Sequence, residues 1–261
     1  MLDHFDRETF ARFAAGELPA EIEMALVRHL DATAVSGDPL QSDTRTTYQE
    51  IRQGKGGYCS DYTQVFNGLA LAAGIGVREW GAAFDGFGGW GHAFSEVFLP
   101  ETGKWVMIDP FYGFWVRDSA TGAPLSVQEF RERLARPDPL AGMSIEVVAP
   151  NMYDFTSPEK LIAWYGRGTS QFYLWWGNNV FDYDEQPLVR VAARFSRSAE
   201  QLAAIIAGVH PRIRILPAEA DGPAYQRFVA NRRRLEVLTG LGIALGLLLV
   251  GEITWLARNR A

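Results

Sequence analysis

Hydrophobic and polar positions follow two different periods in the middle of the chain. Between positions 59 and 74 apolar residues recur at spacings of three and four, which predicts a helix with one buried face that ends at Gly74. Shorter apolar runs then predict strands over 77–84, 93–99 and 104–108. The last two runs are separated by a short turn over 100–103, so we expect them to form an antiparallel hairpin.

Weaker patterns predict the remaining elements. They indicate two short helices between Asp3 and Asp31, a loop over 38–47, a charged helix over 126–134, a helix over 198–207 and a strand over 212–216. The region 151–183 is rich in aromatic residues, most of which we expect in the core, with a sugar-stacking platform or a membrane-surface belt as the alternative. Asp221 and Pro223 predict the start of a helix that runs on into the apolar C-terminal segment.

The C-terminal segment has the length and composition of a membrane-spanning helix. It carries no charge from Val237 to Gly251, and residues 235–257 cover the span that crossing a bilayer requires. We predict a single C-terminal anchor; a buried core helix is the alternative, favoured by Glu236 and Glu252. Arginines are more numerous before the span than after it, which predicts that the preceding domain lies on the cytoplasmic side of a bacterial inner membrane.

Composition narrows the possible functions. The 261 residues are 48% hydrophobic and 21% charged, as in a folded protein. We expect three parts: a main domain over 1–183, a small α/β appendage over 184–222, and a helix that continues into the membrane anchor over 223–261. A net charge of −6 argues against nucleic acid as a partner. The single cysteine excludes an intrachain disulfide and a thiolate zinc cluster, and no HExxH motif is present, so we expect neither a metal nor another cofactor.

The arrangement of one cysteine, one histidine and one aspartate predicts a reactive site. Cys59 begins the predicted helix, where unpaired amides and the helix dipole activate a thiol, and glycines precede it. His92 begins one strand of the predicted hairpin and Asp109 ends the other, so both lie toward the same end of the sheet. The order fits a nucleophile, a base and an orienting acid, although the sequence does not fix the register of the two strands.

Four segments carry a resemblance to a known family. They are GKGGYCSDYTQVF (54–66), AAGIGVR (72–78), HAFSEV (92–97) and KWVMIDP (104–110). Together they resemble the core of the transglutaminase-like superfamily, which is similar in fold to papain, over roughly Gly54 to Gly113. The resemblance implies an α+β fold with a nucleophile helix packed on an antiparallel sheet, with Cys59 as nucleophile, His92 as base and acid, and Asp109 as orienting group. Phe94 departs from the tryptophan that is usual in the family.

The same resemblance suggests further site residues. The backbone amide of Cys59 would supply one oxyanion donor, and Gln53, six positions earlier, has the spacing of the oxyanion glutamine in papain-like enzymes. Trp80 and Trp90 are alternatives, and Gln53 can equally be an exposed polar residue.

Two functions are compatible with these features. The first is a cysteine hydrolase or acyltransferase that acts on peptide or protein amide bonds through a thioester, with hydrolysis as the preferred outcome. The second is a non-catalytic, membrane-tethered interaction module in an envelope or polysaccharide assembly complex. With either function, Gly242 and Gly246 could pack the anchor against a membrane-protein partner or a second copy of the chain.

Overall fold

The computed structural model describes residues 38–84, 90–147, 155, 157–216 and 222–259. The two helices expected between Asp3 and Asp31, and the expected cap at Asp221, lie outside the described residues. The rest is a mixture of helices and antiparallel strands, so the predicted α+β class is confirmed.

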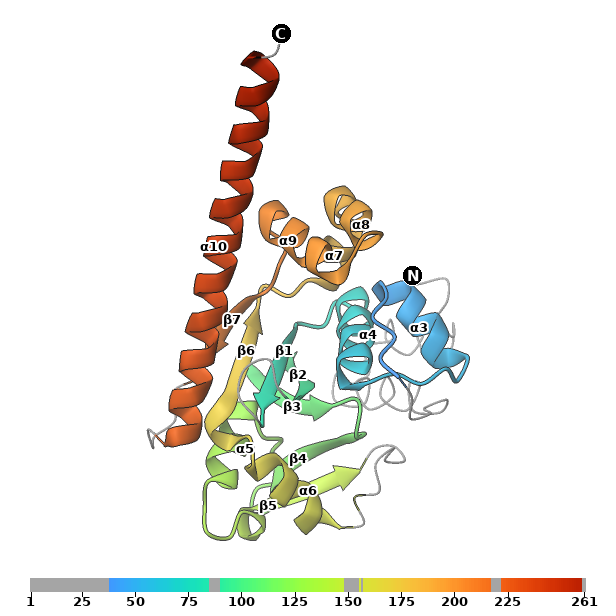
Figure 1. Ribbon diagram of the computed structural model, residues 1–261. Helices are drawn as coiled ribbons and strands as arrows, with labels where there is room; N and C mark the ends of the chain where they lie inside the picture. The colour runs from blue at the N-terminus through green and yellow to red at the C-terminus, as the bar shows by residue number, and fades with distance from the viewer. Residues whose placement is uncertain (1–37, 85–89, 148–154, 156, 217–221, 260–261) are drawn as a thin grey trace.

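A seven-stranded sheet forms the centre of the molecule (Figure 1). Its strands are β1 (Val77–Ala83), β2 (Gly91–Leu99), β3 (Lys104–Asp109), β4 (Phe114–Asp118), β5 (Met143–Val147), β6 (Phe172–Trp176) and β7 (Arg212–Ile215). All described pairs are antiparallel, in the order β5-β4-β3-β2-β1-β6-β7. The expected strands over 77–84, 93–99, 104–108 and 212–216 are therefore confirmed, with ends that differ by one or two residues.

The hairpin of β2 and β3 has an uninterrupted register. Its pairs run from Leu99 opposite Lys104 to Ser95 opposite Ile108, which places Asp109 opposite Phe94. Phe94 and His92 lie two positions apart on one strand and therefore share a face. Asp109 is thus a diagonal neighbour of His92, within reach of its side chain without a bulge.

Among the described residues, two helices precede the sheet, α3 (Thr44–Arg52) and α4 (Cys59–Ala72). The predicted helix over 59–74 is confirmed as α4, which packs on β1 and β2 and joins β2 through a 2.7 Å hydrogen bond from Ser95 to Asn67. The prediction of a loop over 38–47 was wrong for its last four residues, because α3 already begins at Thr44. The Asp43 carboxylate accepts a 3.0 Å hydrogen bond from the Thr46 amide and so caps a helix that begins four residues earlier than the loop prediction allowed.

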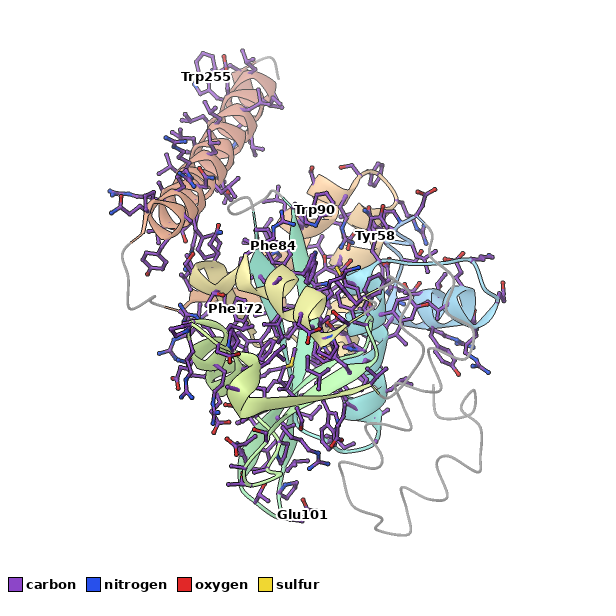
Figure 2. All side chains as sticks on the ribbon, turned by 90° about the horizontal axis from the view of Figure 1, so that it is seen from below. Tyr58, Phe84, Trp90, Glu101, Phe172 and Trp255 are labelled. Carbon is purple, nitrogen blue, oxygen red and sulfur yellow. The ribbon has the colours of Figure 1, made fainter. Side chains whose placement is uncertain are left out.

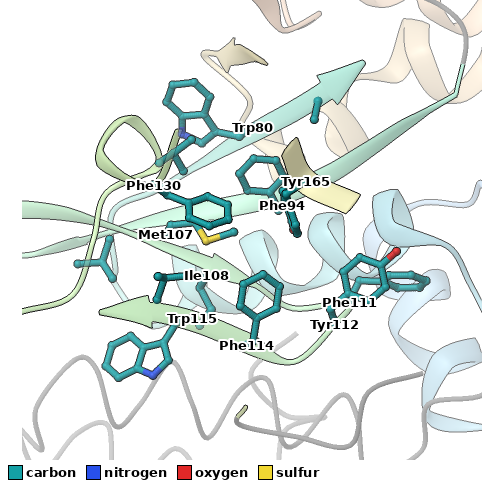
Figure 3. Packing of buried hydrophobic residues seen from close by; sticks show 14 of the residues in the cluster. Trp80, Phe94, Met107, Ile108, Phe111, Tyr112, Phe114, Trp115, Phe130 and Tyr165 are labelled. Carbon is teal, nitrogen blue, oxygen red and sulfur yellow. The ribbon is translucent and has the colours of Figure 1, made fainter. Parts of the chain in front are cut away.

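The remaining helices surround the sheet. They are α5 (Val127–Leu134), α6 (Pro158–Gly166), α7 (Val180–Glu185), α8 (Pro187–Ala193), α9 (Arg197–Ala207) and α10 (Pro223–Asn259), with short 3₁₀ turns at Leu140–Gly142 and Thr169–Gln171. The predicted helices over 126–134 and 198–207 are confirmed as α5 and α9. Figure 3 shows the aromatic core, in which Phe94, Phe114 and Tyr165 converge between the sheet and α6.

The C-terminal helix α10 has two different halves. Near its start Phe228 is fully buried and packs on Tyr173, with ring centroids 5.8 Å apart. Farther on the helix projects from the molecule (Figure 1), and Figure 2 shows Trp255 far out on this projection. Its most apolar 18-residue window has a mean hydropathy of 2.0 and no buried residue. The helix is therefore long and apolar enough to cross a membrane, and it runs unbroken from the domain into that segment, as expected.

Candidate functional site

Cys59 is the first residue of α4 and is half-buried. The chain reaches it through glycines with positive φ angles, including Gly57 at +133°, a conformation that other residues rarely adopt. A Cβ at Gly57 would also lie only 3.3 Å from the ring of Tyr62. The glycines therefore let the backbone turn sharply just before the thiol.

The buried carboxylate of Asp61 holds the start of α4 in place. It accepts a 2.8 Å hydrogen bond from the Tyr58 amide, at the N-cap, and further hydrogen bonds of 3.1 and 3.2 Å from the amides of Leu40 and Gln41. A negative charge in the first helical turn also interacts favourably with the helix dipole. Asp61 thus joins the loop before α3 to the turn that carries Cys59.

His92 and Asp109 are in direct contact. His92 Nε2 lies 2.6 Å from Asp109 Oδ2, and both side chains are buried. Because Nε2 is engaged by the carboxylate, Nδ1 is the ring nitrogen left to face the thiol of Cys59. The diagonal register of β2 and β3 produces this pair directly.

The Asp109 carboxylate has three more hydrogen-bond donors. Oδ1 accepts hydrogen bonds of 2.9 Å from the amides of Phe111 and Tyr112, in the turn that follows β3. Oδ2 also accepts a hydrogen bond from the hydroxyl of Tyr165 on α6. Multiple donors stabilise the ionised carboxylate and fix its orientation toward the imidazole.

Aromatic rings enclose the His92 imidazole. Tyr112 stacks on it with a centroid separation of 4.8 Å, and Trp164 meets it edge to face at 5.0 Å. Burial lowers the pKa of His92, but charge interactions and hydrogen bonds with Asp109 and Cys59 outweigh this effect and raise the pKa from 6.5 to about 9. Cys59 thus interacts with the imidazole both as a charge and as a hydrogen-bond partner. The structure therefore brings the three predicted residues together.

The other predicted residues lie in different settings. Gln53 is exposed at the C-cap of α3, and Trp90 is exposed just before β2 (Figure 2). The buried indole of Trp80 donates a 2.7 Å hydrogen bond to Glu96, four residues along β2 from His92. Four residues of a strand extend over roughly 13 Å. The structure thus directs the Trp80 N–H away from the Cys59–His92–Asp109 cluster.

A cavity of about 650 Å³ lies beside the start of α4. Ser60 and Gln64 of α4 line it together with Glu79 of β1 and residues of α7, α8 and α9. Burial raises the pKa of Glu79 to about 8, and a hydrogen bond from Asn178 opposes this rise. The cavity therefore reaches Ser60, the residue that follows Cys59 in the chain, and the polar side chains of Gln64 and Glu79 line it as well.

The motifs did not reveal two residues that organise the site. Tyr165 lies 56 positions after Asp109 and counted only as one of many aromatic residues, while Asp61 stood unremarked inside the helix motif. An aspartate at the third position of a helix that begins with the predicted nucleophile was the one available indication of its capping role. No local pattern pointed to the hydroxyl of Tyr165.

Fold and geometry together define a class of protein in which a cysteine begins a helix that packs on an antiparallel sheet, opposite a histidine and an aspartate from adjacent strands. Residues 13–110 match the model of the transglutaminase-like superfamily. The match begins earlier than the Gly54 to Gly113 core indicated by the motifs, and it contains Cys59, His92 and Asp109. No curated protein and no solved structure matches the chain significantly.

Proposed function

We propose that this protein is a membrane-anchored cysteine enzyme that cleaves amide bonds by acyl transfer. Cys59 is the nucleophile, His92 the general base and acid, and Asp109 the group that orients the imidazole. The observation that carries the proposal is the continuous contact from the thiol at the start of α4, through the imidazole, to a carboxylate 2.6 Å from the ring. This is the arrangement expected of an activated nucleophile with an oriented base.

The first half of the reaction forms a thioester. The sulfur of Cys59, its proton held by His92, attacks the amide carbonyl carbon, and the resulting oxyanion is stabilised by nearby donors. The C–N bond then breaks, and the amine leaves with the proton from His92. The raised pKa of His92 supports this step, because the imidazole is protonated at neutral pH and ready to donate.

The second half releases the acyl group. Water gives a proton to neutral His92 while its oxygen attacks the thioester, and the C–S bond breaks to yield a carboxylic acid and the free thiol. The amide of Cys59, in the first turn of α4, is the proposed oxyanion donor, since the first amides of a helix have no intrahelical acceptor. Gln53 remains a second donor only if its exposed side chain turns toward Cys59 when substrate binds.

Alkylation of the thiol tests this proposal directly, because Cys59 is the only cysteine in the chain. Iodoacetamide should label the wild-type protein at pH 7 at least tenfold faster than His92→Ala, because the imidazole that holds the thiol proton is lost, and acid–base assistance by a histidine is typically worth about 10²-fold or more. His210→Ala, whose imidazole hydrogen-bonds to the Pro211 carbonyl instead, is the matched control and should react like wild type. Equal labelling of wild type and His92→Ala would refute the proposed role of the imidazole.

The location of the enzyme follows from the charges beside α10. Arg227, Arg232, Arg233 and Arg234 precede the apolar segment, and Arg258 and Arg260 follow it. We therefore place the catalytic domain on the cytoplasmic side of the membrane. Protease added outside intact spheroplasts should leave this domain uncut and digest it only after lysis; digestion before lysis would reverse the orientation.

A further inference from the structure

Helix α9 exposes its large apolar residues and buries its small ones. The side chains of Ala203 and Ala204 are buried against α8, whereas Leu202, Ile205 and Ile206 are exposed, with Ile206 at 69%. The three exposed residues lie at spacings of three and four and so share one face of the helix. A helix that lies between a domain and water normally turns its large apolar residues toward the domain. The opposite arrangement in α9 indicates that its exposed face contacts an apolar environment.

The same apolar surface continues onto α8. Leu188 and Val191, three residues apart, are exposed on α8, and Phe195, in the turn between the two helices, is 80% exposed. We call these six side chains the α8–α9 patch: Leu188, Val191, Phe195, Leu202, Ile205 and Ile206.

Basic residues accompany the patch. The α8–α9 hairpin, residues 187–207, contains three arginines and a single glutamate, in a chain whose net charge is −6. The glutamate, Glu200, is buried and already paired with Arg197 at the start of α9. Arg190 and Arg194 are exposed beside the apolar residues. A surface that combines exposed apolar side chains with excess arginine has the chemistry of a helix that binds an anionic membrane surface.

The position of the hairpin supports the same assignment. Figure 1 shows α8 and α9 at the end of the molecule from which the apolar half of α10 projects, at the same height as the middle of that helix. The apolar window of α10 has no buried residue and is long enough to cross a bilayer. A membrane that receives this window would therefore meet the α8–α9 patch as well.

We propose that the α8–α9 hairpin lies in the interface of the membrane entered by α10, with its apolar patch among the acyl chains and its arginines at anionic headgroups. The hairpin gives the domain a second contact with the bilayer besides α10 and so fixes the orientation of the domain there. The cavity beside Ser60, lined in part by Arg190 and Arg197, then opens near the membrane surface. This inference depends on insertion of α10 and is independent of the Cys59 chemistry.

Fluorescence quenching by spin-labelled lipid tests the inference on the full chain. Single cysteines are introduced at three positions in a Cys59→Ser background, by Ile206→Cys, Leu248→Cys and Glu132→Cys, and are labelled with NBD. Leu248 reports insertion of α10, and the exposed Glu132 on α5 is the matched control. The protein is reconstituted into phosphatidylcholine vesicles, with and without phosphatidylglycerol, that carry nitroxide on the upper acyl chain.

We expect the nitroxide to quench the label at 206 several-fold more than the label at 132, and more strongly with phosphatidylglycerol present. Arg190→Gln combined with Arg194→Gln should remove the dependence on phosphatidylglycerol. Quenching at 248 without quenching at 206 would overturn the inference. So would a label at 206 that is shielded from iodide but not quenched by the lipid, because a protein would then cover the patch. Absence of quenching at 248 would overturn it together with the anchor.

Discussion

The carboxylate of Asp109 is buried and accepts hydrogen bonds from four groups: two backbone amides, one imidazole and one phenol. These donors compensate for the loss of solvation that an ionised carboxylate undergoes in the core. Tyr165 differs from the other donors because its ring also packs against Phe94 and Phe114. Its hydroxyl and its ring therefore contribute separately to the site.

Tyr165→Phe separates those two contributions. The ring packing is retained, while the carboxylate loses one of its donors, so we expect the free energy of unfolding to fall by about 1–3 kcal/mol. Denaturant titration of the purified protein measures the change. Tyr225→Phe, on the first turn of α10, is the control and should have little effect; an equally small effect of Tyr165→Phe would show that its hydroxyl does not support Asp109.

The raised pKa of His92 predicts a pH dependence of stability. The unfolded imidazole titrates near 6.5 and the folded one near 9, so the folded state binds the proton more tightly. The resulting stabilisation is fully present below about pH 6.5, declines as the pH rises, and is lost above about pH 9. Thermal unfolding of wild type should show this decline, and His210→Ala should retain it. A flat profile between pH 6.5 and 9 would contradict the coupling of His92 to Asp109 and Cys59.

At the scale of single residues, the site could be predicted where a residue stands in a recognisable local pattern. Cys59, His92 and Asp109 stand at the ends of predictable elements, and their chain order is distinctive. Trp164 and Tyr165 are brought to His92 by tertiary packing of α6 on the sheet, which no local spacing encodes. Donors to a buried group are therefore harder to predict than the group itself.

At the scale of elements, the start of α4 depends on Asp61. Asp61→Asn keeps one acceptor but removes the charge and places an amide among three backbone donors, so we expect a loss of about 2–3 kcal/mol in unfolding free energy. Slower alkylation of Cys59 should accompany it, because the turn that aims the thiol loosens. Asp182→Asn, exposed on α7, is the control. Unchanged stability and alkylation in Asp61→Asn would mean that the glycine turn alone positions the thiol.

The order of strands shows where element prediction stops. The β2–β3 hairpin is local in sequence and was predicted from its short turn. Strand β6 lies about ninety residues after β1 and yet pairs with it, and β7 pairs with β6 in turn. Such non-local pairing is decided by which apolar faces fit together, and in the aromatic region 151–183 the sequence has no clear period. The division at residues 183 and 222 consequently remains a prediction.

At the scale of the whole molecule, α10 connects the domain to its proposed anchor. Phe228 fixes the near half of α10 on Tyr173, so a chain that ends after Glu236 should keep the domain folded while losing the apolar segment. We expect this truncated protein to be released from membranes by alkaline carbonate, whereas the full chain stays in the pellet. Release of the full chain under the same conditions would exclude a membrane-spanning α10.

The coupling of the thiol to the imidazole and the carboxylate underlies the proposed chemistry, and NMR titration of the His92 ring measures it most directly. In the intact protein His92 should titrate near pH 9, and blocking Cys59 with methyl methanethiosulfonate should lower that value because the sulfur no longer interacts as a charge or a hydrogen-bond partner. A His92 pKa near 6.5 that does not change when Cys59 is blocked would contradict the account.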